Sequence, residues 1–318
     1  MTILQRIKNM LTSGASDTEF GLLRFDYTTF SPGYTPPDCN LGDYIQSLAA
    51  KQYLPENAEL TLIDRDTLRY YAGRPVKMIM NSYYFLSEKS EVFSDKIDPV
   101  MVSIHIKNTE YISNPPRKNT IEYLKKHEPI GCRDHNTELT LSQLGVKSYF
   151  SGCLTTTLDM KYKAQESDRT DEIIFCDYKF GDFPQADKYL KSLKAYDFRN
   201  IIYTTHSVSK DLTHQERFQA AEDLLRRYAK AKLVVTRRIH CALPCLALGT
   251  PVILVNRKYD FKRFNGLYSL LNTVGENAEE EFEIRVNLNK DGTVFNSRDY
   301  LKYARKLKST VKKKVKKS

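Results

Sequence analysis

The sequence lacks the long apolar run that a membrane-spanning helix needs, about 18 uninterrupted residues. Its longest candidate, residues 241–255, is interrupted by Pro244, Gly249 and Pro251. Residues 1–14 have no continuous apolar core of the kind found in a signal peptide, and their spacing predicts a short amphipathic helix. The six cysteines are scattered without a CxxC pair, which is typical of free thiols. We therefore expect a cytoplasmic protein.

Motifs that identify many nucleotide and metal enzymes are also missing. The chain has no GxxxxGK[ST] loop and no GxGxxG turn, so nucleoside triphosphate and Rossmann dinucleotide sites are unsupported. It has neither HExxH nor GxSxG, and its six histidines show no metal-ligand spacing. Cys241 and Cys245 lie one helical turn apart beside His240, but small apolar packing explains them better than metal binding. We expect no metal and no cofactor.

The excess of positive charge is confined to one end of the chain. Lys and Arg number 49 against 39 acidic residues, and nine of them fall within residues 302–318, which hold no acid. Without those nine the balance is 40 against 39, or +1. A thin apolar stripe follows the segment at Tyr303, Leu307, Val311 and Val315. The pattern favours a basic amphipathic tail on an anionic membrane surface over a solvated tail, and it does not favour nucleic acid.

Strand and helix patterns alternate at short spacing on both sides of a polar stretch, residues 161–170. The first half reads as strands at 59–65, 75–81, 99–106, 129–133 and 146–152, with helices at 42–54, 120–127 and 135–145. The second half repeats the alternation up to residue 255. We predict an α/β fold of two Rossmann-like domains facing a cleft, residues 1–160 and 171–296, followed by a basic tail at 297–318.

The stretch VVTRRIHCALPCLALGTPVILV, residues 234–255, carries the strongest local signal of function. It reads as strand, helix and strand, so Arg237, Arg238 and His240 fall at the carboxyl end of a strand and the start of a helix. Ligands of open α/β sheets bind at that edge, and a helix start adds unpaired N–H groups and partial positive charge. Two guanidiniums there predict an anion site for phosphate or carboxylate. The alternative is that the arginines are solvated and that His240 is a capping or packing residue.

Two other segments place polar groups at helix starts. In CNLGDYIQSLAA, Asn40, Gly42 and Asp43 open a helix, and Asp43 is either its cap or a base in a loop that faces a substrate. In IGCRDHNT, Arg133 and Asp134 follow a strand in the other half of the chain. Arg133 would add a second cationic group to the same cleft, with Asp134 as a cap or as its orienting partner.

These segments resemble, in order, the motifs of the polysaccharide pyruvyl transferase family. CNLGDYIQSLAA is similar to its N-terminal motif, IGCRDHNTELTLSQLGV to its Arg-Asp motif, and RRIHCALPCLALGTPVILV to its Arg–aliphatic–His motif. YDFK, residues 259–262, resembles the lysine motif that follows. The segment SGCLTTTL, residues 151–158, departs from the aspartate–proline pattern usual there.

The resemblance implies a fold like that of GT-B glycosyltransferases, with the acceptor bound by the first domain and the donor by the second. It implies transfer of the enolpyruvyl group of phosphoenolpyruvate to two hydroxyls of one sugar, forming a pyruvate ketal in capsular, exopolysaccharide or cell-surface glycan biosynthesis. By position it assigns the donor site to Arg133, Arg238, His240 and Lys262, with Lys258 as an alternative to Lys262. Asn40, Gly42 and Asp43 then belong to the acceptor side.

The chemistry that the resemblance implies assigns the protons. His240 is our candidate general acid for the methylene carbon, and Asp43 or Asp134 accepts the hydroxyl proton. The expected acceptor is a sugar on a lipid carrier at the inner membrane face, where a peripheral protein would meet it. Two other functions share the sequence features: a GT-B glycosyltransferase that uses a nucleotide sugar, and a non-catalytic scaffold at the membrane surface.

Overall fold

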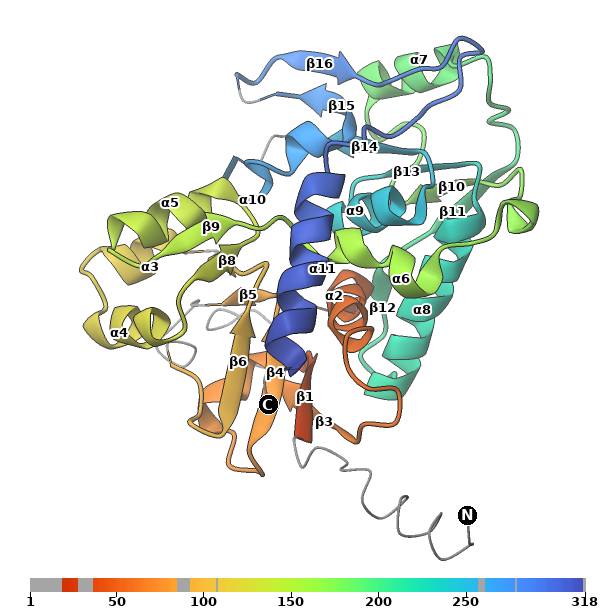
Figure 1. The fold of residues 1–318 in the computed structure, drawn as a ribbon. Helices are drawn as coiled ribbons and strands as arrows, with labels where there is room; N and C mark the ends of the chain where they lie inside the picture. The colour runs from red at the N-terminus through yellow and green to blue at the C-terminus, as the bar shows by residue number, and fades with distance from the viewer. Residues whose placement is uncertain are drawn as a thin grey trace, which may run out of the picture.

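The structure is a computed structural model that describes residues 19–27, 37–84, 92–106, 108–256, 261–277 and 279–316. Its strands form two larger sheets, each with helices around it (Figure 1). The predicted N-terminal amphipathic helix and Lys258 lie outside the described residues, as does the side chain of Lys262.

The first sheet is parallel and has the strand order β3-β1-β4-β6. Every residue of β4 is buried, as its apolar run predicts for a strand covered on both faces. Two short parallel pairs, β5 with β7 and β8 with β9, continue this half of the molecule. Its strands are β1 (Glu19–Arg24), β3 (Leu60–Asp64), β4 (Val76–Met80), β5 (Tyr83–Tyr84), β6 (Ile97–Met101), β7 (His105–Ile106), β8 (Ile130–Cys132) and β9 (Ser148–Phe150).

The second sheet has six strands in the order β11-β10-β13-β14-β15-β16, parallel except for the last pair. Its centre is formed by the apolar strands β13 and β14, both predicted from the sequence. Its strands are β10 (Ile173–Cys176), β11 (Ile201–Thr204), β13 (Leu233–Thr236), β14 (Val252–Asn256), β15 (Asn272–Glu276) and β16 (Phe282–Arg285).

All residues of β13 and β14 are buried, which is the pattern of central strands in a parallel sheet. The helices that surround the two sheets are α2 (Leu41–Lys51), α3 (Thr109–Ser113), α4 (Lys118–Lys126), α5 (His135–Gln143), α6 (Asp159–Tyr162), α7 (Pro184–Ser192), α8 (His214–Lys230), α9 (Ile239–Leu248), α10 (Phe261–Phe264) and α11 (Leu301–Lys316). The predicted helices begin and end close to their predicted bounds, while the short helices α3, α6 and α10 were not predicted.

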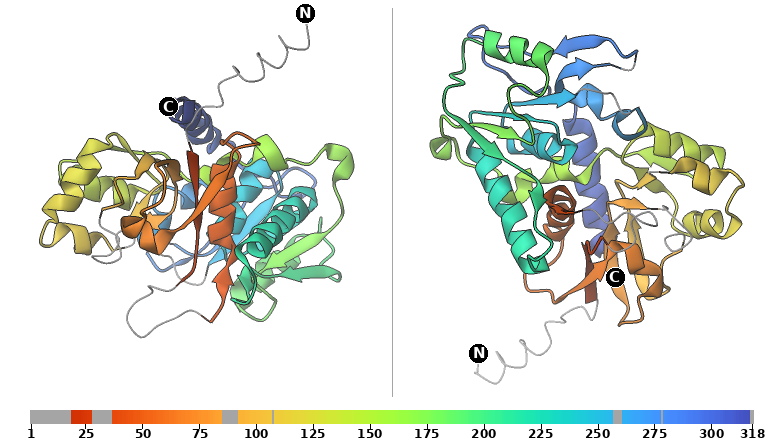
Figure 2. Two further views of the ribbon diagram at one scale, coloured as in Figure 1. Left: turned by 90° about the horizontal axis from the view of Figure 1, so that it is seen from below. Right: turned by 180° about the vertical axis from the view of Figure 1, so that it is seen from behind.

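The two halves are joined by direct contacts rather than by the linker alone. Helix α2 of the first half packs on α8 and α9 of the second, as Figures 1 and 2 show from opposite sides. Strand β2 (Cys39–Asn40) pairs antiparallel with β12 (Ser207–Val208), so one short ladder crosses between the halves. One apolar core contains buried residues of both sheets. The α/β class with parallel sheets is therefore confirmed, while the division into domains with a GT-B cleft stays a prediction.

Helix α11 corrects our expectation for the C-terminal segment. The predicted apolar stripe does not face outward: Leu307, Val311 and Val315 are buried, and Tyr303 packs edge-on against Phe150. The helix lies against β6 and the 3₁₀ turn at residues 154–157 (Figure 1). An amphipathic helix buries its apolar stripe against whatever apolar surface is available, and here the first half of the protein supplies it. The stripe is thus unavailable to lipid, and only the cationic face of the helix remains exposed.

Candidate functional site

The starts of α2 and α9 meet at the centre of the molecule. A Cβ added to Gly42 would lie 3.2 Å from the Cβ of His240 and 3.2 Å from Nδ1 of His206. The backbone N–H of Leu41 donates to the carbonyl of His206 at 2.7 Å. Glycine at residue 42 therefore lets the first turn of α2 approach both histidines, which any larger side chain would push apart. This close approach of Gly42 is made to protein, at the point where the two halves join.

Asp43 is a buried carboxyl and not the cap of α2. Asn40 is the cap, because its Oδ1 accepts from the N–H of Gly42 at 3.0 Å. Asp43 Oδ2 accepts from the hydroxyl of Tyr27 at 3.0 Å, and Oδ1 accepts from the amide of Gln46 at 3.1 Å. Burial raises the pKa of Asp43, and nearby arginines oppose that shift. A carboxyl held in this way is suited to exchanging a proton.

Arg133 is buried at the carboxyl end of β8, with only 3% of its surface exposed. Its Nε has no hydrogen-bond partner, and its guanidinium forms no ion pair within the part of the chain that the structure describes. Burial lowers the pKa of Arg133, and the charge of Arg263 adds to the effect, whereas Asp134 opposes it. An unpaired cation in such a place is costly unless a ligand supplies the anion. Arg133 is therefore the strongest anion-binding candidate in the described structure.

Asp134 is the cap of α5, as one of our two alternatives proposed. Its Oδ1 accepts from the N–H of Thr137 at 2.8 Å. Its Oδ2 lies 2.7 Å from Nδ1 of His105, so the partner that it orients is His105 and not Arg133. Both oxygens of Asp134 are thus engaged, one in the helix cap and one with His105.

His240 lies in the first turn of α9 and is 7% exposed. Its Nε2 has no hydrogen-bond partner in the described part of the chain. Burial lowers the pKa of His240 well below its ordinary value, and the charges of Arg133 and Arg263 lower it further. The imidazole is thus neutral in the ligand-free protein, and a bound anion would favour its protonation. A general acid at His240 accordingly has to take up its proton together with the anion.

Arg238 is arranged differently from Arg133. It occupies the cap position of α9 without a side-chain hydrogen bond to the helix. Its Nε donates to Asp177 Oδ2 at 2.8 Å, and 44% of its side chain is exposed. Asp177 also accepts from the backbone N–H of His206 at 3.0 Å. The structure therefore brings Arg133, His240 and Asp43 together and pairs Arg238 with a carboxylate at the surface.

Several residues of this centre were missed by the sequence reasoning. Arg65 follows β3 directly, is 2% exposed, and forms two hydrogen bonds with Asp66 at 2.8 and 2.9 Å. The positive charge of Arg263 lowers the pKa values of Asp43, Arg133 and His240. For Arg65 the signal was available, because it is another arginine at the end of a strand. Arg263 directly follows YDFK, one residue beyond the segment that we matched, and Lys262 lies beside it on α10. His105 had no local signal.

One group of side chains has the composition of a soft-metal site. Cys176, His206 and Cys241 are buried, and their ligand atoms all lie within 4.8 Å of one another. The hydroxyl of Tyr228 already lies 3.2 Å from Cys176 Sγ and 3.2 Å from His206 Nε2. Burial and the neighbouring thiol keep the pKa of Cys176 above its ordinary range, so the thiol is protonated. Without a metal the group is a hydrogen-bonded core contact beneath the start of α9.

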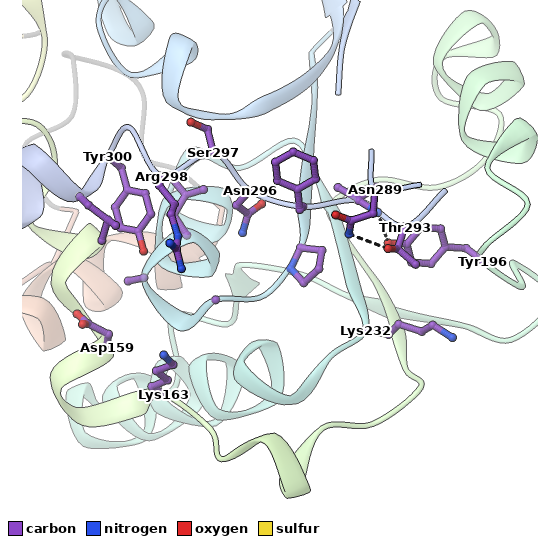
Figure 3. Close-up of a pocket in the computed structure, with 17 residues that line it drawn as sticks. Asp159, Lys163, Tyr196, Lys232, Asn289, Thr293, Asn296, Ser297, Arg298 and Tyr300 are labelled. Atoms are coloured by element: carbon purple, nitrogen blue, oxygen red, sulfur yellow. Dashed lines mark hydrogen bonds between the residues drawn. The ribbon is translucent and has the colours of Figure 1, made fainter. Parts of the chain in front are cut away.

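Two surface cavities lie away from this centre. One of about 600 Å³ lies at the C-terminal end of α9, and Figure 3 shows Asp159, Lys163 and Arg298 on its walls. Another of about 530 Å³ is lined by Arg69 and Tyr123 among others. Neither contains a predicted site residue. The candidate site is defined by buried, unpaired polar atoms rather than by open volume.

Fold and site together define a class: an α/β protein of two parallel sheets, with a buried cationic centre where helix starts from both halves meet. The chain belongs to the polysaccharide pyruvyl transferase family, whose sequence profile matches residues 40–259, more than half of its length. No curated protein matches it. A similar solved structure is the functionally uncharacterised protein KP1_0663 from Klebsiella pneumoniae subsp. pneumoniae NTUH-K2044. It is 16% identical, with a TM-score of 0.46, covering 87% of this chain and 100% of that one. Among the described residues, no helix is both long enough and apolar enough to cross a membrane.

Proposed function

We propose that this protein transfers the pyruvyl carbons of phosphoenolpyruvate to two hydroxyls of one sugar residue, forming a pyruvate ketal in the synthesis of a cell-surface glycan. The observation that carries the proposal is Arg133, a buried guanidinium that forms no ion pair with any residue that the structure describes and lies beside the neutral His240. Family membership supports the same donor. No cofactor is part of the scheme.

Phosphoenolpyruvate has a phosphate and a carboxylate, so it needs two anion sites close together. Arg133 supplies one cation, and Arg263 adds a second charge to the same centre. The start of α9 adds backbone N–H groups, and the side chain of Arg238 at its cap position does not bond to them. Lys262 on α10 is a further candidate, and Arg238 joins the donor site if its ion pair with Asp177 opens. Guanidinium pairs and helix starts are the groups that suit phosphate and carboxylate.

The proton balance of the reaction matches the groups available. Protonation of the methylene carbon makes C2 electrophilic, one hydroxyl attacks C2, phosphate leaves, and the second hydroxyl closes the ring. Two hydroxyl protons are released: one completes the new methyl group and the other leaves with phosphate. His240 delivers the proton to carbon once the donor has raised its pKa. Asp43, buried on the α2 side, accepts a hydroxyl proton, with Asn40 and Gly42 shaping that side.

The acceptor that we propose is a lipid-linked sugar at the cytoplasmic face of a membrane. With the apolar stripe of α11 buried, attachment depends on its exposed cations, which include Lys302, Lys306 and Lys312. Such attachment is electrostatic and weakens with salt. A charge-only contact would hold the protein near its acceptor without inserting into the bilayer.

Isothermal titration calorimetry and thermal-shift measurements of ligand binding test the proposal. Phosphoenolpyruvate should bind the wild-type protein and raise its melting temperature, because a ligand that binds only the folded state stabilises it. UDP and GDP are the matched competitors, since a GT-B glycosyltransferase would bind one of them instead. If a nucleotide stabilises the protein and phosphoenolpyruvate does not, the protein is a glycosyltransferase and the proposal is wrong. Stabilisation by neither would favour the scaffold.

A further inference from the structure

His105 has the arrangement of a histidine that is held in place for proton transfer. It lies in β7, and its Nδ1 is 2.7 Å from Asp134 Oδ2. The side chains are 3% and 0% exposed. Asp134 is itself fixed, because its other oxygen accepts from the N–H of Thr137. A carboxylate at Nδ1 keeps the hydrogen on that nitrogen, which leaves the lone pair of a neutral imidazole on Nε2.

The Nε2 atom of His105 is buried and has no hydrogen-bond partner among the residues that the structure describes. Most buried polar atoms have a partner, so an orphaned one needs a reason. Burial lowers the pKa of His105 to about 4, and the charges of Arg133 and Arg263 add to the shift while Asp134 opposes it. The imidazole is thus neutral near pH 7. His240 is affected by His105 in turn, which puts both histidines in one electrostatic centre.

We propose that His105, oriented by Asp134, is a second proton-transfer residue of this site and accepts the proton of one acceptor hydroxyl at Nε2. The inference rests on the proposed function, because the proposed reaction releases two hydroxyl protons and each of them needs a base. At His105 the O–H bond breaks as the O–C2 bond forms, and the proton moves to Nε2. The imidazolium then returns it to the departing phosphate. Asp43 serves the other hydroxyl.

Replacing Asp134 by asparagine tests the orientation of His105 while keeping the cap that α5 needs to fold. Asp134→Asn keeps a good helix cap for α5, since asparagine is among the preferred capping residues. Its amide can donate to Nδ1 of His105, which would move the ring hydrogen to Nε2 and remove the lone pair. The matched control is His135→Gln, because His135 Nδ1 pairs with Glu138 Oε2 at 2.8 Å but 46% of its side chain is exposed.

The first measurement is ¹⁵N NMR of the histidine rings at pH 7, with phosphoenolpyruvate added. We expect the wild-type His105 ring to be neutral with its hydrogen on Nδ1, and Asp134→Asn to move that hydrogen to Nε2. A wild-type ring with its hydrogen on Nε2, or a charged one, overturns the proposal. This result does not depend on knowing the acceptor.

The second measurement is phosphate release with methyl hexopyranosides that carry free 4- and 6-hydroxyls. We expect His105→Gln and Asp134→Asn to lower turnover about 10²-fold or more, the usual range for general acid–base catalysis, with phosphoenolpyruvate affinity within about threefold of wild type. Imidazole should partly restore His105→Gly. Full turnover by His105→Gln refutes the inference alone. A wild-type protein that does not bind phosphoenolpyruvate refutes the proposed function, and the inference with it.

Discussion

Arg133 and Arg238 occupy equivalent local positions and have opposite environments. Each follows the last residues of a strand and opens a helix, β8 into α5 and β13 into α9. Arg133 is 3% exposed and forms no ion pair with the described residues, whereas the Arg238 side chain is 44% exposed and bound to Asp177. The local pattern thus locates a cation at the edge of a sheet. The neighbours then decide whether that cation is available to a ligand.

The largest expected effect separates the two arginines by their contribution to donor binding. Arg133→Met should weaken phosphoenolpyruvate binding about 10²- to 10³-fold, because truncating a buried charge that pairs with a ligand costs about 2–5 kcal/mol. Arg238→Met should weaken it less than about fivefold, as expected for an exposed pair. Isothermal titration at one ionic strength measures both. A larger loss in Arg238→Met would move the donor site to the position that the sequence suggested most strongly.

The contrast between buried and exposed positions extends to α11. Leu307→Ala should lower the free energy of unfolding by about 2–5 kcal/mol, because Leu307 is 1% exposed in the core. Lys312→Ala, on the exposed face, is the control and should change it by less than about 0.5 kcal/mol. Urea denaturation measures both changes. Equal, small effects would mean that the helix is not part of the folded core.

A third comparison uses proton uptake at His240. Its pKa is depressed in the free protein, and an anion at Arg133 should raise it. Between the two pKa values the complex holds more protons than the free protein, so donor affinity should increase as pH falls, by at most about tenfold per pH unit. Titration in buffers of different ionisation enthalpy counts the protons taken up. The His240→Gln variant measures the protons that the donor phosphate takes up by itself. If this variant takes up as many protons as the wild-type protein, the proton belongs to a group other than His240.

The smallest effect concerns Asp177, the partner of Arg238. Hydrogen bonds from Thr205 and His206 and the charge of Arg238 lower its pKa. That stabilisation is present above the ordinary carboxyl pKa of about 4 and is lost as pH falls through the lower value in the folded state. Asp177→Asn should therefore cost about 1 kcal/mol or less at pH 7, and the difference from wild type should shrink in acid. Melting curves at pH 7 and pH 3 make the comparison, and a difference that grows in acid would contradict it.

Much of the fold followed from the periodicity of the chain. The predicted strands at 59–65 and 75–81 are β3 and β4, and the unit at 232–255 is β13, α9 and β14. The predicted strand at 99–106 is two strands, β6 and β7, because the chain turns at Ser103 with a φ of 54°. The outer strands β15 and β16 were not predicted: β15 is short and carries little alternation, whereas the alternating FEIR of β16 was overlooked.

The candidate site could be predicted only in part. Strand ends and helix starts identified Arg133 and His240, because parallel strands bring their carboxyl ends to one edge. They could not show that Asp134 pairs with His105, 29 residues away. Nor could they reveal that Arg238 is paired with Asp177, 61 residues away.

The sequence by itself determined the family, the alternation of strands and helices, and which residues stand where strands become helices. These properties depend on neighbours in the chain, on apolar period and on backbone conformation. Tertiary structure alone decided that the stripe of α11 is buried, that Arg133 is enclosed with no ion-pair partner among the described residues, and that Asp134 holds His105. Burial and pairing depend on groups distant in the chain, and desolvation makes them decisive for charge.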